Sequence, residues 1–339
     1  MALSNRVLTT TQTKLWDKVQ DTILTSNVVA TRIMTAPKTW SGRQIEKPVK
    51  TSKNSQFSTF SGMEVLADAP VDNTQKMVWD ATFAHIPVTL PGTELSLNAT
   101  TERVIDLMSF SLVSSTQDMA DGMGSAFYGN GLGDASAFAG LGYLIDDGTV
   151  SATIGGLSRT TYPTLVSDVT AAAGGVISLD KMATQYDAAS SGAIRPSIIA
   201  TTKAGFSLYE KLLTPQERIN KTVTFTKDKR HGGAGFVTAD YRGTPVVADE
   251  KCTTGQYIFI NEDTINWYAL DVAKAEMLGM KSAMIEGNNY STSSNMGFAW
   301  SNFVKPTNVY ALVSHIFAAG QFIVENPRYN SKITDVTTT

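Results

Sequence analysis

Two stretches with strand-like patterns, separated by a long excursion, place the strongest constraint on how this chain can fold. In the second stretch, Met77, Trp79 and Phe83 fall on one face of an alternating pattern that is typical of a strand. Residues 43–53 are its expected partner. Because a two-stranded hairpin is only marginally stable in water, we expect the arm at residues 40–91 to lie on another surface. That surface belongs either to another subunit or to the domain that carries the arm.

The excursion between those strands, residues 54–74, is rich in turn-forming residues. Loops of this length are uncommon inside compact domains and usually have a function. Aromatic side chains are enriched at the energetically dominant positions of protein interfaces. We therefore predict inter-subunit contacts at aromatic residues of the arm and of an N-terminal helix, namely Trp16, Phe57, Phe60, Trp79 and Phe83.

Helix and strand patterns follow one another along the rest of the chain. A short amphipathic helix is predicted at residues 14–25, and a far longer one at residues 100–128. At ~1.5 Å per residue, the longer helix would extend about 40 Å. Residues 178–260 alternate between helix and strand patterns, with Ser178 as a helix N-cap, and residues 309–324 form an apolar strand. This order of elements indicates an α+β fold.

The charge content of the chain limits the ligands that it can attract. Charged residues make up 17% of the 339 residues, against roughly 25% in ordinary soluble domains. A net charge of -3 excludes attraction of nucleic acid through bulk positive charge, so any DNA nearby is not held strongly. The longest uncharged apolar segment, residues 309–324, is shorter than the ~20 residues that a membrane span requires. We therefore predict no membrane as a partner.

Residues with catalytic potential are few and dispersed. His85 and His315 lie in strand patterns and are interpreted as structural, whereas His231 begins a glycine-rich stretch similar to the oxyanion-hole loop of some esterases. No G-x-S-x-G segment supplies the matching nucleophile. The single cysteine, Cys252, has no histidine beside it in the sequence and cannot form an intramolecular disulfide. We predict no catalytic residues, no cofactor and no metal; an esterase-like hydrolase that uses His231 is the enzyme alternative.

Six short stretches are distinctive in this chain. They are residues 128–131 (YGNG), 140–148 (GLGYLIDDG), 156–163 (GLSRTTYP), 201–203 (TTK), 242–252 (RGTPVVADEKC) and 326–328 (NPR). In their order, and together with the order of the predicted elements, they resemble the major capsid protein of tailed bacteriophages, which has the Hong Kong 97 type of shell fold. No chemical mechanism is attached to these stretches, so the resemblance rests on their number and order over nearly the whole chain.

The resemblance implies an α+β, Hong Kong 97-like capsid fold with an N-terminal arm, an extended hairpin loop, a peripheral domain with a spine helix, and an axial domain. The implied bounds are residues 1–39 for the arm, 40–91 for the loop, 92–166 and 289–339 for the peripheral domain with its long strands, and 167–288 for the axial domain. In such proteins the extended loop lies across a neighbouring subunit.

The same resemblance implies a structural function with no enzyme activity. Many copies would associate as hexamers and pentamers into the icosahedral head shell of a tailed phage, which encloses double-stranded DNA without sequence-specific binding. A separate scaffolding protein, a portal and a decoration protein are the further partners implied. The location would be the virion capsid, after assembly in the host cytoplasm. The alternative is an encapsulin-like nanocompartment shell protein with the same fold.

Overall fold

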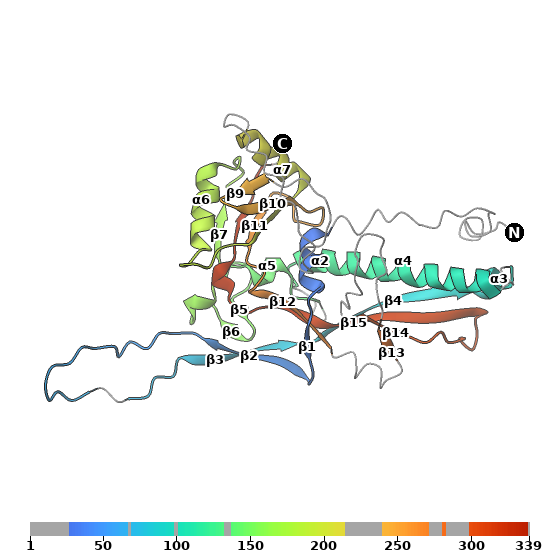
Figure 1. The fold of residues 1–339 in the computed structure, drawn as a ribbon, viewed down its shortest axis with the longest axis horizontal. Coiled ribbons are helices and arrows are strands. Elements are labelled where there is room, and N and C mark those ends of the chain that lie inside the picture. The colour runs from blue at the N-terminus through green and yellow to red at the C-terminus, as the bar shows by residue number, and fades with distance from the viewer. Residues whose placement is uncertain are drawn as a thin grey trace.

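The computed structural model describes residues 27–66, 69–97, 101–131, 137–213, 239–270, 280–282 and 298–337. The predicted helix at residues 14–25 lies outside the described residues, and so do Trp16 and His231. The described residues form an elongated body from which a hairpin projects at one end (Figure 1).

One sheet runs along the body and contains the longest strand. Among the described residues its six strands have the order β1-β12-β15-β14-β13, and β4 also pairs with β15. The strands are β1 (Lys38–Trp40), β4 (Thr82–Pro91), β12 (Ile265–Leu270), β13 (Met280–Ser282), β14 (Phe298–Ser301) and β15 (Ala311–Val324). β15 confirms the apolar strand predicted at residues 309–324.

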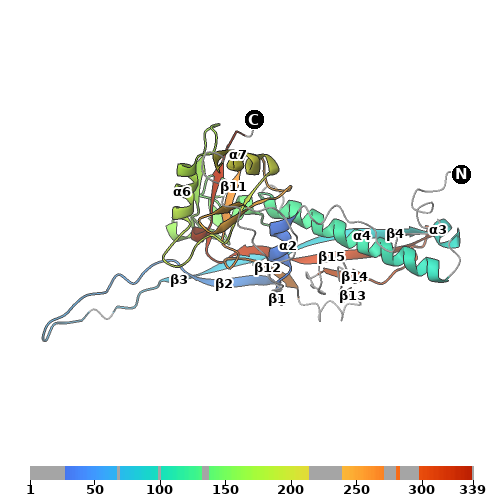
Figure 2. The ribbon, with the colours of Figure 1, turned by 45° about the horizontal axis from the view of Figure 1, so that its top comes forward.

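β4 and β15 form an antiparallel pair that we call the β4–β15 ribbon. β4 pairs with β15 along its whole length, from Thr82 to Pro91. The long helix α4 (Thr101–Tyr128), which follows α3 (Gly92–Leu97), lies along one face of the ribbon (Figure 2). Alternate side chains of β4, such as Val88, are buried on that face. The prediction of a helix at residues 100–128 is confirmed to within one residue.

Aromatic rings pack the end of α4 against this first sheet. Phe127 is completely buried, and its ring centroid lies 5.0 Å from that of Phe322 in β15. Phe322 lies 4.7 Å from the ring of Trp267 in β12. Met119 and Met123 are buried on the same side of the helix. Burial of each such side chain stabilises the fold by about 1.5–3 kcal/mol, so α4 is held by its apolar stripe.

The second sheet is smaller and carries its own helices. Six strands of the described chain take the order β7-β16-β11-β8-β10-β9 in it. They are β7 (Asp168–Ala171), β8 (Ile198–Thr201), β9 (Ala239–Tyr241), β10 (Thr244–Ala248), β11 (Tyr257–Ile260) and β16 (Ser331–Thr334). Helix α6 (Leu179–Ala188) packs on β7 and β16, and α7 (Lys203–Leu213) packs on β10.

The path of the chain between the two sheets differs from the implied domain bounds. β16 belongs to the final segment of the chain, yet it lies in the second sheet between β7 and β11. Conversely, β12 comes before residue 289 but pairs with β15 in the first sheet. A hydrophobic pattern identifies a strand without naming its partner. The first sheet therefore contains β12 and β13, which lie within residues 167–288, and the second sheet contains β16 from residues 289–339.

The predicted hairpin is present but ends earlier than predicted. β2 (Gln44–Lys50) pairs with β3 (Thr74–Asp80), and residues 51–73, which we call the hairpin tip, connect them. Residues 82–91 do not belong to this arm, because they form β4 in the first sheet.

The remaining short elements are α2 (Val28–Met34), α5 (Leu141–Leu144), β5 (Thr153–Ile154), β6 (Leu157–Ser158) and the 3-10 helices η2 (Pro163–Leu165) and η3 (Pro327–Tyr329).

Two local signals of the second sheet are confirmed. The Ser178 hydroxyl accepts a hydrogen bond from the backbone N–H of Lys181 at 3.3 Å, as an N-cap of α6 should. Arg242 and Gly243 connect β9 to β10, and both have positive φ, 50° and 82°. Two-residue hairpin turns of this kind match the twist of the strands that they join.

A buried carboxylate joins three segments that are far apart in the sequence. Asp249, directly after β10, has no exposed surface. It accepts hydrogen bonds from the Tyr128 hydroxyl at 2.9 Å and from the backbone N–H of Val29 at 3.2 Å. Burial raises the pKa of Asp249, and these hydrogen bonds oppose part of that rise. Asp249 thus connects the end of α4 and the start of α2 to the second sheet.

Replacing Tyr128 with Phe tests this junction. The variant leaves one oxygen of a buried carboxyl group without its hydroxyl donor, so we expect the free energy of unfolding to fall by about 1–3 kcal/mol in urea denaturation. Tyr310→Phe is the matched control, because its hydroxyl pairs with Ser96 at an exposed position. The control should change stability by less than about 0.5 kcal/mol. Equal losses in both variants would contradict the role given to Asp249.

Candidate functional site

The hairpin tip exposes apolar side chains that the subunit does not cover. It extends away from the body beyond β2 and β3 (Figure 1). Phe57 is 90% exposed and Phe60 is 63% exposed. Met63, Val65 and Leu66 are also exposed. Contiguous exposed apolar groups of this kind indicate an interaction site in a soluble protein.

Only the aromatic part of this surface was predicted from the sequence. The prediction rested on the enrichment of aromatic residues at interfaces, so it did not include Met63, Val65 and Leu66. Their signal was available in the sequence: they form an apolar run inside a turn-rich excursion, where turn chemistry does not require apolar side chains. A search for apolar residues in predicted loops would have found all five members of the tip surface.

Trp79 does not lie at the surface, which corrects its place among the predicted contact residues. It is 5% exposed, and its ring meets the Tyr143 ring edge-on with centroids 6.1 Å apart. Its strand neighbour on the same face, Met77, is fully buried. Gly155 packs so closely on both side chains that an added Cβ would lie 2.9 Å from Met77. Trp79 therefore packs β3, one of the two strands of the hairpin, into the subunit's own core.

Phe83 is exposed, but it lies on the β4–β15 ribbon and not on the hairpin. It is 69% exposed on the face turned away from α4. Three more rings share that face: His85 lies 5.7 Å from His315, and His315 lies 5.8 Å from Phe317, measured between centroids. The two histidines thus pack with aromatic neighbours, and this ribbon face forms a second partly exposed apolar surface.

An ionic cluster fixes the hairpin stem, which is the pair of strands β2 and β3, to the body. Glu325, directly after β15, lies 2.8 Å from the Lys38 ammonium and 3.1 Å from the Lys47 ammonium. The Tyr268 hydroxyl donates to the same carboxylate oxygen at 3.0 Å. Lys47 also lies over the Tyr268 ring, 5.0 Å from its centroid. Because Lys47 belongs to β2, this cluster sets how the stem leaves the first sheet.

The protonation equilibria of this cluster favour its charged form. Burial alone would raise the pKa of Glu325, but hydrogen bonds from Lys38, Lys47 and Tyr268 outweigh it and lower that pKa below 4.5. Burial alone would lower the pKa of Lys47, and its bonds to Tyr268 and Glu325 instead raise it. Both groups are therefore charged at neutral pH, and the stem is held by opposite charges.

Two buried titratable side chains of the described chain, Cys252 and Asp146, have structural surroundings. Cys252 is buried, and burial raises the pKa of its thiol, which opposes thiolate formation. The Asp146 carboxylate is buried in a turn, where it accepts backbone hydrogen bonds from Gly148 at 3.0 Å and Ser151 at 2.9 Å.

Within the described ranges no group of three or more potential metal ligands occurs. No helix in that part of the chain is both long and apolar enough to cross a membrane.

Comparison with solved structures assigns the fold. A subunit of the cyanophage A-1(L) capsid superposes with a TM-score of 0.72 and 17% identity, and the match covers 96% of both chains. The fold is that of a phage capsid protein. The SrpI encapsulin complex of Synechococcus elongatus PCC 7942 gives a TM-score of 0.58 at 10% identity, covering 95% of this chain and 93% of that one. The capsid of the native GTA particle gives 0.58 at 8% identity, with 96% and 94% covered.

The likeness is one of structure, because sequence comparison adds no relative. No family model matches the chain, and no curated protein matches it. The phage-capsid fold expected from the sequence is confirmed. At these identities single residues cannot be transferred between chains, so the surfaces described above stand on the geometry of this chain alone.

Replacing Glu325 with Gln tests the ionic cluster. A carboxyl group whose pKa is lowered by folding stabilises the fold above its unfolded pKa, and this contribution is lost as the pH falls through the folded pKa. We expect Glu325→Gln to cost about 1 kcal/mol near pH 7, because it weakens two partly exposed ion pairs. The difference from wild type should shrink as the pH falls below about 4.5. Urea denaturation over this pH range measures it.

Glu46→Gln is the matched control, since Glu46 pairs with Lys76 at a more exposed site within the same stem. Its effect should be smaller, and its pH dependence should be weaker. A difference between wild type and Glu325→Gln that does not change from pH 7 to acid would contradict the charged cluster.

Proposed function

We propose that this chain is the major capsid protein of a tailed phage and that many copies form the icosahedral head shell. The observation that supports this most is the superposition on a phage capsid subunit with a TM-score of 0.72 over 96% of both chains. An exposed apolar hairpin tip adds to it, because the isolated subunit gains nothing from leaving such side chains in water.

Assembly in this proposal proceeds by repeated association of the same chain in hexamers and pentamers. A standard protein interface buries roughly 1,200–2,000 Å² in total, and each subunit of a closed shell takes part in several. The hairpin tip crosses to a neighbouring copy and buries its apolar side chains there. The chain acts structurally and catalyses no reaction.

The further partners in this proposal follow from what a phage head contains. The shell encloses double-stranded DNA without sequence-specific binding, which fits a net charge of -3, since tight phosphate binding requires a basic surface. A separate scaffolding protein directs closure, and a portal and a decoration protein bind the shell. Assembly takes place in the host cytoplasm, and the mature location is the virion.

An encapsulin-like compartment is the second candidate, because one of the superposed structures is an encapsulin complex. Its TM-score of 0.58 is lower than the 0.72 of the cyanophage capsid, which favours the phage. Electron microscopy of the purified full chain distinguishes the two. Closed shells formed by the chain alone would support a compartment, whereas tubes or sheets that become closed shells only with a scaffold would support a phage head. A chain that stays monomeric under all conditions would contradict both.

Replacing residues 52–72 with the dipeptide Asn-Gly tests the role of the tip. Asn-Gly closes a two-residue hairpin after Thr51, whose N–H already bonds to the Asn73 carbonyl at 2.9 Å. The subunit should keep its free energy of unfolding to within about 0.5 kcal/mol, because the removed apolar side chains are exposed. Electron microscopy should show no normal closed shells.

A Gly/Ser segment of the same length as residues 52–72 is the control for loop length. It should fail in assembly as the shortened variant does, because it also lacks the apolar side chains. If either variant forms normal shells, the apolar side chains of the tip are not required for assembly. Unfolding of the isolated variants would show that the tip belongs to the subunit's own core.

A further inference from the structure

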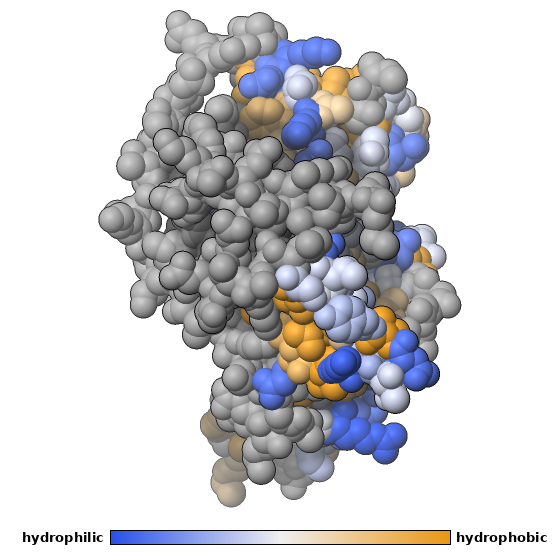
Figure 3. All heavy atoms as spheres, turned by 90° about the vertical axis from the view of Figure 1, so that its right-hand side faces the viewer, coloured by the Kyte–Doolittle hydropathy of each residue, from blue (hydrophilic) through white to orange (hydrophobic). Residues whose placement is uncertain are grey.

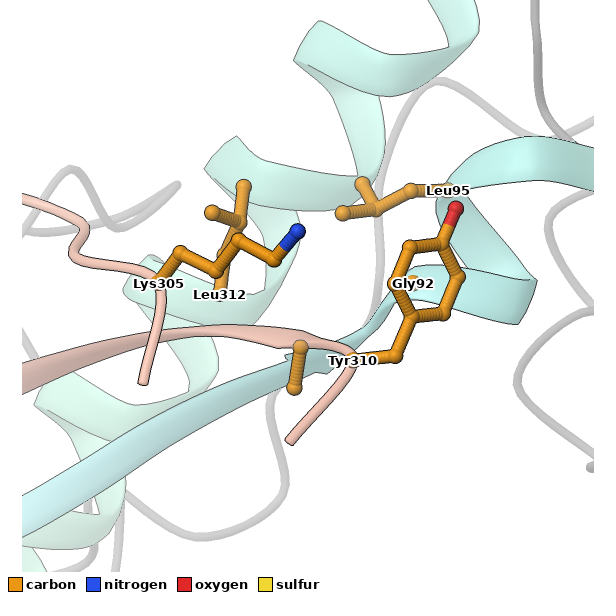
Figure 4. A pocket seen from close by; sticks show the side chains of 6 residues that line it. Gly92, Leu95, Lys305, Tyr310 and Leu312 are labelled. Atoms are coloured by element: carbon orange, nitrogen blue, oxygen red, sulfur yellow. The ribbon is translucent and has the colours of Figure 1, made fainter. Parts of the chain in front are cut away.

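The end of the first sheet farthest from the hairpin contains an open pocket. It has a volume of about 230 Å³ and is lined by Gly92, Leu95, Lys305, Tyr310, Ala311 and Leu312. Figure 4 shows the Lys305 side chain reaching toward the Tyr310 ring, with Leu95 above them. A cavity of roughly 150 Å³ lined by apolar side chains is enough to take a benzene molecule. This pocket therefore has room for one apolar side chain.

Tyr310 is held in place although its side chain is 62% exposed. Its carbonyl accepts from the Gly92 N–H at 2.8 Å, and its hydroxyl lies 2.9 Å from the Ser96 hydroxyl. Its ring packs on Gly92, where an added Cβ would lie 2.3 Å from the nearest ring carbon. An exposed aromatic ring with a fixed position loses little entropy when a partner binds, so it is suited to recognition.

Apolar and charged groups around the pocket define the chemistry of its partner. Val304 and Val309 are more than half exposed beside it. Figure 3 shows hydrophobic residues gathered at this end of the molecule, with hydrophilic residues among them. The Lys305 ammonium lies 5.7 Å from the centroid of the Tyr310 ring, and no carboxylate in the described part of the chain pairs with it. The partner should thus combine an apolar group with a negative charge.

The hairpin tip has this combination. Glu64 lies between Met63 and Val65, and all three side chains are exposed. Gly62, with φ of 72°, bends the chain just before them. Methionine is flexible enough to fill an irregular pocket, and its sulfur makes favourable contacts with aromatic rings. The tip and the pocket lie at opposite ends of the molecule, so one copy cannot join its own two surfaces (Figure 1).

We propose that the pocket at the end of the β4–β15 ribbon receives the hairpin tip of another copy, with Glu64 against Lys305 and Met63 beside Tyr310. The inference rests on the proposed function, because it names the surface that the tip contacts during assembly. It is a head-to-tail contact, which forms closed rings when the rotation between copies closes. Pocket-to-pocket contact between copies is disfavoured because it would bring two Lys305 side chains together.

Charge exchange tests the pairing. Lys305→Glu alone and Glu64→Lys alone should each raise the subunit concentration needed for assembly by about tenfold, since each places like charges against each other. The double variant should return this concentration to within about threefold of wild type, measured by light scattering and electron microscopy. Asp72→Lys is the matched control, because it makes the same charge change at another exposed position of the tip.

Asp72→Lys combined with Lys305→Glu should not restore assembly. If Glu64→Lys and Asp72→Lys restore it equally, or if neither does, the pairing is overturned.

Cysteine cross-linking gives a second readout that does not depend on charge. The double variant Glu64→Cys/Lys305→Cys, assembled and then oxidised, should give a ladder of covalent multimers on a denaturing gel. The native thiol, Cys252, is buried and adds little background. Shells that assemble without forming the ladder would overturn the docking site and leave the proposed function intact. A wild-type chain that forms no shells would overturn both.

Discussion

The pairing of β4 with β15 is the constraint on which the other features of the subunit depend. It runs the full length of β4, and α4 lies along one of its faces. Glu325 follows β15 and holds the hairpin stem, whereas Tyr310 precedes β15 and forms the wall of the pocket. The two candidate assembly surfaces are therefore placed at opposite ends of one rigid ribbon, at a separation that the hydrogen-bonded register sets.

This arrangement gives a physical reason for the low charge content of the chain. Interface cores are depleted in charged residues, and a subunit that shares its tip and its distal pocket with other copies, as we propose, has less surface for them. Only 17% of the residues are charged. The charges beside the hairpin stem, Glu325 with Lys38 and Lys47, have an internal structural role. The same composition that excludes strong DNA binding is thus expected under the proposed self-association.

The sequence predicts elements well and their partners poorly. The long helix and the Ser178 cap depend on local periodicity and local hydrogen bonding, and both are confirmed. The placement of β12 and β13 in the first sheet and of β16 in the second depends on contacts between distant segments, which hydrophobic periodicity does not report. For the same reason Trp79 was misplaced: an alternating strand has two faces, and only the Tyr143 contact shows which one is buried. The distal pocket was missed because it combines Gly92 with Tyr310, which are far apart in sequence.

Hydrogen exchange measures most directly whether the hairpin tip is buried against another copy of the chain. Exchange of the amides of residues 52–72 is compared between isolated subunits and assembled particles, with the β4–β15 ribbon as an internal reference. We expect rapid exchange of the tip in isolated subunits and exchange at least about tenfold slower in particles, with the ribbon protected in both. Equally rapid exchange of the tip in both states would contradict its burial against another copy.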